Sequence, residues 1–308
     1  MTRSEDGPLN MQTPDILQAL LVVVLWGFNF VVIKWGVADV PPLLLGCLRF
    51  SLLALGGLFW VARPRLPWRW VALYGLTVGF GQFAGLFCAI KFGMPAGLAS
   101  VVLQSQAFFT MLLAALFLRE HWRPAQLAGL LLAAGGLALI GLARGGNMTL
   151  IGFVLTLLAA SSWALSNVVV RAMVRHGLQI EPLGLVVWSG LAPPLPFLAL
   201  SLWLEGGARD WHALTHFSWG SLAAVAYLAF AASMLGYGIW SRLLSRYPAN
   251  SVAPFSLLVP LVALLCSTVL LGEQLTAIQM LGSVLLLSGL LVNLFGPKLL
   301  NSLLKQSS

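Results

Sequence analysis

Apolar runs of about 20 residues recur along the whole chain, and short polar stretches separate them. A helix needs roughly 20 apolar residues to cross the hydrocarbon core of a bilayer. The pattern therefore predicts an all-α integral membrane protein with ten transmembrane helices. We expect the spans at residues 16–36, 42–62, 70–91, 96–118, 125–143, 151–172, 183–204, 218–240, 249–271 and 277–296.

One stretch of the chain occurs twice. Residues 95–136 align with residues 248–289 at a constant shift of 153 and without a gap, which pairs Glu120 with Glu273. Matched Glu, Gln and Pro residues are informative here, because Leu matches are expected in so Leu-rich a chain. We interpret the two stretches as an internal duplication. Five spans per copy is an odd number, so the second copy is expected to be inverted, as in secondary transporters.

The first spans of the two copies agree less closely. Trp26 and Lys34 align with Trp163 and Arg171 at a shift of 137. We expect residues 1–147 to form an N-terminal five-helix repeat, residues 148–297 a C-terminal inverted repeat, and residues 298–308 a cytoplasmic tail. The longest linker, residues 205–217, has the length of an ordered surface loop.

Composition and charge agree with this class. Hydrophobic residues make up 59% of the chain and charged residues 8%, against about 25% charged in soluble domains. A net charge of +8 would suit nucleic-acid binding, but the basic residues lie in short loops between apolar runs. Twelve Lys and Arg residues fall on one side of the expected spans and four on the other. The positive-inside rule then predicts that both termini are cytoplasmic.

Enzymatic activity is not expected. An intramembrane hydrolase needs a nucleophile with a base, a pair of aspartates or metal ligands at membrane depth. The four histidines fall in expected loops, none of the nine acidic residues falls in mid-span, and the three cysteines lie in apolar runs. We expect no cofactor, no metal site and no disulfide framework. A binding scaffold is also disfavoured, because the loops are short.

Several segments resemble a known family. They read LWGFNFVVIKWG, LRF, FGMPAGLASVVLQSQAFFTMLLAALFLRE, GYGIWSRLLSRYPANSVAPFSLLVPLVALL and LLGE, within residues 16–297. They are similar to EamA-type members of the drug/metabolite transporter superfamily. The resemblance implies a multi-pass exporter of the bacterial inner membrane, acting on amino acids or related metabolites such as cysteine and O-acetylserine.

The inverted duplication suits alternating access between the two halves. The alternative is a broad exporter of aromatic amino acids or of amphipathic and cationic compounds. The expected partners are a small-molecule substrate and the lipid bilayer, with no nucleic acid and a monomeric chain.

Polar and aromatic residues within the spans are the candidate substrate-binding residues. Lipid penalises polar side chains, so they should face a cavity or hydrogen-bond between helices. Aromatic rings with a polar group suit amphipathic substrates, or else belong to an interfacial belt. The candidates are Trp26, Asn29, Gln82, Gln104, Gln106, Trp163, Asn167, Tyr237 and Ser256. Gln104 and Gln106 are two residues apart, so we expect only one of them in the cavity.

Arg49 lies inside the second expected span, away from its ends. A charge there costs about 2.5–3.5 kcal/mol on insertion scales. Our hypothesis is that Arg49 lines the pathway and attracts a substrate carboxylate. Snorkelling to the interface, or pairing with backbone carbonyls at helix ends, is the alternative.

Four residues are candidate gating residues. Pro254 and Pro260 interrupt the ninth expected span, whereas the matched residues of the fourth span are Val101 and Ala107. Proline would bend only that half. Glu120 and Glu273 end the matched spans. Each is expected to stabilise the start of the next helix, with a gate ion pair as the alternative.

Overall fold

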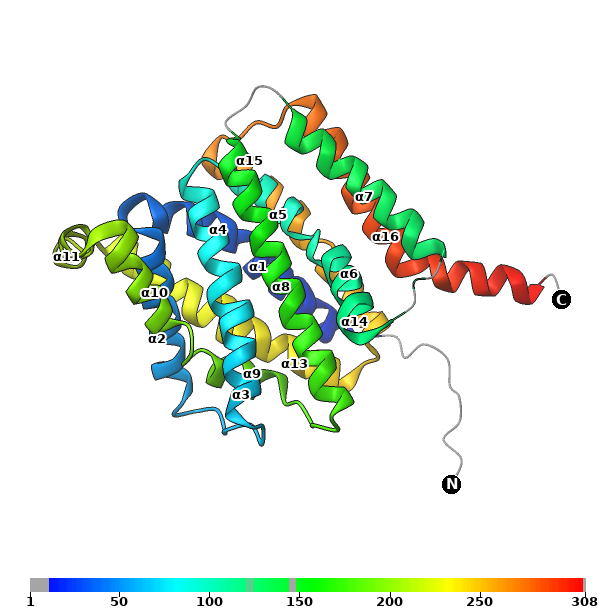
Figure 1. Cartoon of the computed structure of the whole chain (residues 1–308), viewed down its shortest axis with the longest axis horizontal. Helices are drawn as coiled ribbons and strands as arrows, with labels where there is room; N and C mark the ends of the chain where they lie inside the picture. The colour runs from blue at the N-terminus through cyan, green and yellow to red at the C-terminus, as the bar shows by residue number, and fades with distance from the viewer. Residues whose placement is uncertain (1–10, 121, 123, 144–147, 307–308) are drawn as a thin grey trace.

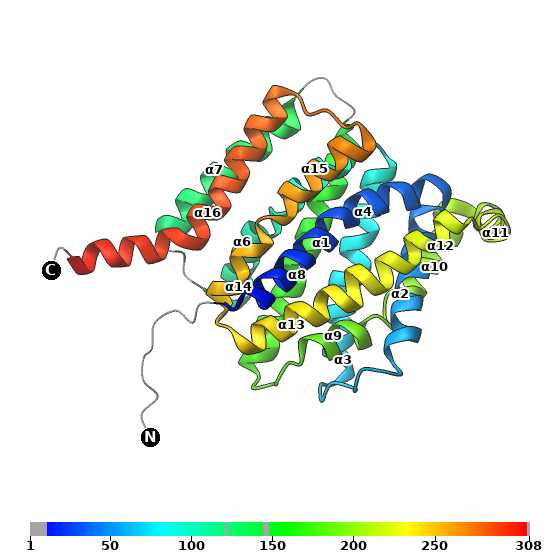
Figure 2. The same cartoon turned by 180° about the vertical axis from the view of Figure 1, so that it is seen from behind.

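The computed structural model describes residues 11–120, 122, 124–143 and 148–306. Over these residues the regular elements are all helical, and none of them forms a strand. Figure 1 shows helices that cross one another within a single bundle, and Figure 2 shows the same bundle from behind. The all-α fold class expected from the sequence is confirmed.

Each of the ten expected spans has a helical counterpart. Within the described residues, nine segments of 19 to 34 residues are apolar enough to cross a membrane, and a tenth apolar helix has 16 residues. In chain order the elements are α1 (Thr13–Asp39), α2 (Pro42–Gly57), α3 (Trp68–Tyr74), η1 (Gly75–Gly81), α4 (Gln82–Lys91), α5 (Ala96–Leu103), α6 (Gln106–Leu118), α7 (Pro124–Leu142), α8 (Leu150–Arg175), α9 (Pro182–Ser189), α10 (Pro194–Ser201), η2 (Leu202–Gly206), α11 (Gly207–Thr215), α12 (Trp219–Ala226), η3 (Tyr227–Leu235), α13 (Gly236–Arg246), α14 (Ala249–Ser256), α15 (Val259–Leu271) and α16 (Ala277–Gln306).

One expected boundary is wrong. Residues 205–217 are largely helical instead of forming a loop, because η2 and α11 continue the seventh span. The polar sequence of α11 is anchored by Asp210, a buried carboxylate that accepts a hydrogen bond of 2.9 Å from the Ser201 hydroxyl. The last helix, α16, continues through residues 298–306, so the described part of the expected cytoplasmic tail is helical.

The fourth and ninth spans are broken at matched positions. The bounds of α5 and α6 coincide with those of α14 and α15 at the shift of 153. At each break, two successive amides bond carbonyls three residues back, which tightens the turn. The expectation that only the proline-containing half bends is therefore wrong. Pro254 lies inside α14 and Pro260 in the first turn of α15, but the break at Gln104–Ser105 forms without proline.

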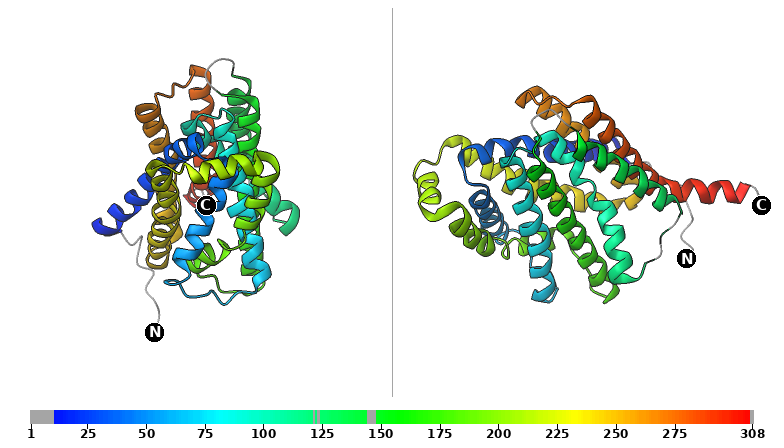
Figure 3. Two further views of the ribbon diagram at one scale, coloured as in Figure 1. Left: turned by 90° about the vertical axis from the view of Figure 1, so that its left-hand side faces the viewer. Right: turned by 45° about the horizontal axis from the view of Figure 1, so that its top comes forward.

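The central core lies among α1, α4, α5 and α8, where Ile33, Phe87, Leu98 and Ala159 are fully buried. Helices α7 and α16 form a separate pair along one edge (Figures 1 and 3). Small residues let their backbones approach closely, as is common between membrane helices. A Cβ atom at Gly136 would lie 2.5 Å from the Gly282 carbonyl oxygen, and one at Gly129 would lie 2.6 Å from that of Gly289.

Substitution of Gly136 by valine should weaken this helix pair. The added side chain meets backbone instead of a flexible side chain, so we expect a loss of about 1–3 kcal/mol. The measurement is the apparent melting temperature of the purified protein in detergent. Gly135→Val is the matched control, because nothing lies within 4 Å of a Cβ atom there. Equal melting temperatures for the two variants would contradict the close crossing.

Candidate functional site

A cavity of about 460 Å³ opens between α6, α8 and the α7–α16 pair. This volume lies within the range of small-molecule sites. Its walls combine polar side chains with apolar ones. The lining residues are Gln106, Ala107, Thr110, Met111, Glu120, Trp122, Gln126, Asn167, Val170, Arg171, Leu290, Asn293 and Leu294.

A polar network inside the cavity joins α6 to α8. The Asn167 side-chain amide donates to the Gln106 side-chain oxygen at 2.8 Å and to the Thr110 hydroxyl at 3.1 Å. Thr110 in turn donates to the backbone carbonyl of Gln106 at 2.7 Å. Gln106 and Thr110 share a face of α6 because they are four residues apart. The network thus presents amide and hydroxyl groups toward the space that a ligand would fill.

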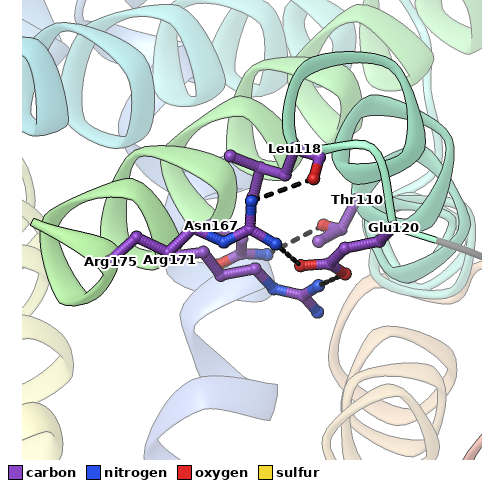
Figure 4. A network of polar contacts seen from close by, with 6 residues as sticks. All are labelled: Thr110, Leu118, Glu120, Asn167, Arg171 and Arg175. Carbon is purple, nitrogen blue, oxygen red and sulfur yellow. Dashed lines mark hydrogen bonds and ion pairs between the residues drawn. The ribbon is translucent and has the colours of Figure 1, made fainter.

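Glu120 and Arg171 belong to the cavity lining and, together with the neighbouring Arg175, form a charged network (Figure 4). The Glu120 carboxylate receives Arg171 at 2.5 Å and Arg175 at 3.3 Å, and Arg175 also donates to the Leu118 carbonyl at 2.9 Å. These side chains are 35–51% exposed, so solvent screens the ion pairs. The sequence left two roles open for Glu120, stabilising the start of the next helix or forming an ion pair, and the structure shows an ion pair.

The opposite end of the fourth span is packed shut. Both carboxylate oxygens of Glu273 accept backbone hydrogen bonds from the first turn of α5, at 2.8 Å from Ala96 and 3.0 Å from Gly97. A Cβ atom at Gly97 would lie 2.1 Å from the Ser267 hydroxyl oxygen of α15. The expectation that Glu273 stabilises the start of the next helix is therefore wrong, because its carboxylate accepts hydrogen bonds from the start of α5 instead. The next helix, α16, begins with reciprocal Thr276–Gln279 hydrogen bonds that form a capping box.

The other predicted residues lie outside this cavity lining. Trp26 donates its indole N–H to the Ala232 carbonyl at 2.9 Å, and its ring packs on Tyr237 with centroids 5.2 Å apart. Tyr237 also lines a second, much smaller pocket together with Arg49. Trp163 packs against the central core.

The remaining polar candidates are dispersed. Asn29 and Gln82 are buried on α1 and α4, and each has a side-chain oxygen without a partner among the described residues. Gln104 lies in the break between α5 and α6, so Gln106 alone of that pair lines the cavity. The Ser256 hydroxyl donates to the Ala253 carbonyl of its own helix.

Acidic residues extend further into the helices than the sequence indicated. Asp15 lies in the first turn of α1, is buried, and accepts a hydrogen bond of 2.7 Å from the Tyr247 hydroxyl. Glu205 lies in η2 and accepts from the Leu43 and Leu44 amides at the start of α2, at 3.1 and 3.2 Å. The described residues contain no group of three His, Cys, Asp or Glu side chains placed to hold a metal ion.

Comparison with known proteins decides the family. A family model described as the EamA-like transporter family matches residues 13–142 and 150–295, once in each half. The chain belongs to this family. It is therefore a multi-pass membrane transporter and not an enzyme, and the resemblance inferred from the sequence is confirmed.

Similar proteins span nearly the whole chain. A "Probable amino-acid metabolite efflux pump" of Salmonella typhimurium is 52% identical, covering 93% of this chain and 96% of the relative. A protein of the same name from Escherichia coli is 48% identical over the same shares. A "Probable terminal-alkyne amino-acid exporter" of Streptantibioticus cattleyicolor is 28% identical, covering 89% and 91%. One crystal structure shares the fold with a TM-score of 0.59 and 22% identity, covering 92% of this chain and 96% of that chain.

Sequence reasoning missed several residues of the cavity. Thr110 follows Gln106 by one helical turn, and this spacing was the available signal. Arg171 was noted only as the counterpart of Lys34. Asn293 and Leu290 come from α16, and no local pattern indicates that this helix faces α6 and α8.

The two ends should differ in reactivity toward maleimides. After replacement of the three native cysteines by alanine, Val170→Cys in the cavity wall should react readily with N-ethylmaleimide in membranes. Ser267→Cys should react slowly, because Ser267 is only 1% exposed and packs against α5. Labelling rates followed by mass shift give the comparison. Similar rates at both positions would contradict the one-sided opening.

Proposed function

We propose that this protein exports amino-acid metabolites by alternating access and loads its substrate into the 460 Å³ cavity from the cytoplasm. The names of the Salmonella, Escherichia and Streptantibioticus relatives support the substrate class. The excess of Lys and Arg on the Glu120 side supports a cytoplasmic position for the cavity mouth. In this orientation the described conformation faces inward.

One observation carries the alternating-access proposal: two matched glutamates have different partners. Glu273 caps α5 through the amides of Ala96 and Gly97. The shift of 153 matches these two positions to Ala249 and Asn250, the first residues of α14. Glu120 is the counterpart of Glu273, but it binds Arg171 and Arg175 beside an open cavity. An inverted repeat thus supplies a second conformation in which the two glutamates exchange roles.

The basic partner of Glu120 also has a counterpart in the other repeat. Lys34 is the counterpart of Arg171, and its ammonium group lies 3.5 Å from the Ile90 carbonyl oxygen in this conformation. In the outward-facing conformation, Glu120 would cap α14 and Glu273 would leave α5 to pair with Lys34. Each end then alternates between a helix cap and an ion pair, so neither conformation leaves a carboxylate without donors.

The mouth chemistry favours zwitterions over cations. Arg171 and Arg175 outnumber Glu120, so the entrance carries a net positive charge that attracts a carboxylate and repels a cationic compound. Within the cavity, Asn167, Gln106 and Thr110 offer donors and acceptors, while Met111 and Leu290 offer apolar surface. Small polar amino acids such as cysteine and O-acetylserine match this combination better than a cationic dye does.

Transport in proteoliposomes tests the substrate class. Radiolabelled L-cysteine and O-acetyl-L-serine should exchange by counterflow, whereas L-phenylalanine should exchange weakly and ethidium should not. Asn167→Ala removes the donor shared by Gln106 and Thr110, so counterflow at low substrate should fall about fivefold to tenfold. Ser161→Ala is the control, because within the described part of the chain its hydroxyl bonds only the Leu157 carbonyl of its own helix. Ethidium transport without amino-acid counterflow would favour the cationic-compound alternative.

Glu273→Gln should open the closed end. Glutamine has one acceptor oxygen and no charge, so it replaces the two-amide cap poorly. In intact cells, an impermeant maleimide added outside should label Ser267→Cys at least about tenfold faster when Glu273 is also changed to Gln. Glu181→Gln is the matched control, because Glu181 makes no side-chain bond to the helix that follows it. Unchanged labelling in cells, with normal labelling after detergent lysis, would argue against the exchange.

A further inference from the structure

Arg49 occupies an unusual position in the middle of α2. It is 3% exposed, and its terminal Nη2 donates to the Ser233 hydroxyl of η3 at 3.0 Å. The guanidinium lies over the Phe83 ring, with its carbon 3.9 Å from the ring centre. Its Nε and Nη1 atoms have no hydrogen-bond partner among the described residues. Arg49 therefore does not snorkel, and the residues described here give it no backbone carbonyl acceptor.

The other buried charged side chains have hydrogen-bond partners that stabilise their charge. Among the described residues, the charged side chains in the buried class are Asp15, Asp210 and Arg49. Asp15 is bonded by Tyr247 and Arg246, and Asp210 is bonded by Ser201. A buried charge without a counter-ion is strongly unfavourable, and such residues in membrane spans normally mark a substrate pathway. Asp15 and Asp210 each have hydrogen-bond donors that stabilise their charge. An arginine with a purely structural role would correspondingly have carboxylate or carbonyl acceptors, and Arg49 has neither among the described residues.

Arg49 faces a small pocket whose other polar groups are hydroxyls. Tyr74, Ser189, Ser233 and Tyr237 line this pocket with Arg49, and the rest of the wall is mainly apolar. The Ser189 and Ser233 hydroxyls donate to the Val186 and Leu228 carbonyls, so the donors left for a ligand are the guanidinium and the two tyrosine hydroxyls. Such donors in an apolar surround suit a carboxylate, which accepts a two-bond fork from arginine. The pocket has a volume of about 20 Å³, which is room for about one water molecule. In this conformation it is contracted.

The pocket walls are built from irregular backbone. Tyr74 directly precedes the π-helical segment η1, Ser233 belongs to the π-helical segment η3, and Ser189 precedes the break before α10. Such segments are frequent at functional sites, and in membranes they occur where backbone is buried in protein or lines a cavity. A return of η1 or η3 to α-helical geometry would change the register of the wall and the width of the pocket.

We propose that the Arg49 pocket is a second substrate site, which expands during the transport cycle and binds the carboxylate of the exported amino-acid metabolite. This inference rests on the proposed function, and it assigns the carboxylate to a site that shares no lining residue with the cavity. A small inorganic anion such as chloride has the same chemistry as a carboxylate toward Arg49. The experiment therefore includes both.

The probes are radiolabelled L-cysteine with L-cysteinamide and cysteamine as competitors, under reducing conditions. Cysteinamide lacks the carboxylate charge, and cysteamine lacks the carboxylate. In the wild-type protein, L-cysteine should compete about 10- to 100-fold better than either analogue. In Arg49→Gln the preference should fall to the smaller part that the cavity mouth contributes, through weaker L-cysteine binding, while binding of the two analogues persists and shows that the protein is folded. Arg49→Lys should give an intermediate preference, because it keeps the charge and loses the fork. Ser161→Ala is the control that keeps Arg49 and should retain the preference, because Ser161 lines neither pocket and its hydroxyl bonds the Leu157 carbonyl of its own helix.

Distinct results separate the inference from the proposed function. Equal competition by L-cysteine and L-cysteinamide in the wild type, or an unchanged preference in Arg49→Gln and Arg49→Lys, would overturn the Arg49 site and leave export intact. Chloride is tested by titrating it into L-cysteine binding assays of the wild type and of Arg49→Gln. If chloride weakens L-cysteine binding only in the wild type, and the preference for L-cysteine over its analogues is equal in the two proteins, Arg49 binds a small anion and the carboxylate site is likewise overturned. Absence of saturable L-cysteine binding to the wild type would overturn the proposed substrate class and the inference with it.

Discussion

Helix ends are the constraint on which this structure depends. The first amides and last carbonyls of a helix have no partner within it, and the bilayer interior offers no water to replace one. The chain meets this need with charged side chains from distant segments. Glu273 caps α5, Glu205 caps α2, and the Lys91 ammonium binds the Val37 carbonyl near the end of α1 at 2.5 Å. The two glutamate caps join the two sequence halves, whereas the Lys91 bond links the third span to the first within the N-terminal half.

Broken helices add further helix ends whose backbone groups need partners, and they allow those partners to be exchanged. The fourth and ninth spans each consist of two short helices, so α5 and α14 have only eight residues each. Helices of this length depend on tertiary partners, and a charged cap at their first turn carries much of that dependence. A side chain that bonds two backbone amides holds a helix without interlocking side chains. Such a contact can be exchanged for an ion pair without repacking the core.

The fold was largely predictable because its signals are long and periodic. Runs of apolar residues located the ten spans, and matched residues such as Pro95 and Pro248 anticipated that α5 and α14 begin at equivalent positions. Long-range partners were not predictable. Nothing local indicates that Glu273 reaches Ala96, or that Asp210 makes a polar stretch helical by burial against Ser201. The break at Gln104 was missed because it is made by backbone hydrogen bonds, which the sequence does not show. Proline marks the equivalent break in the second copy, but the first copy has no proline there.

The two candidate sites differ in how their positive charge is balanced. At the cavity mouth, Glu120 already neutralises part of the charge of Arg171 and Arg175, and water screens the remainder. A carboxylate would therefore be attracted there but held weakly. Arg49 has no counter-ion among the described residues and is shielded from solvent, so the same carboxylate would be held more strongly. On the proposed route, entry is then a passage from weak to strong binding. Release requires the Arg49 pocket to contract again, returning the guanidinium to Ser233 and the Phe83 ring as its remaining partners.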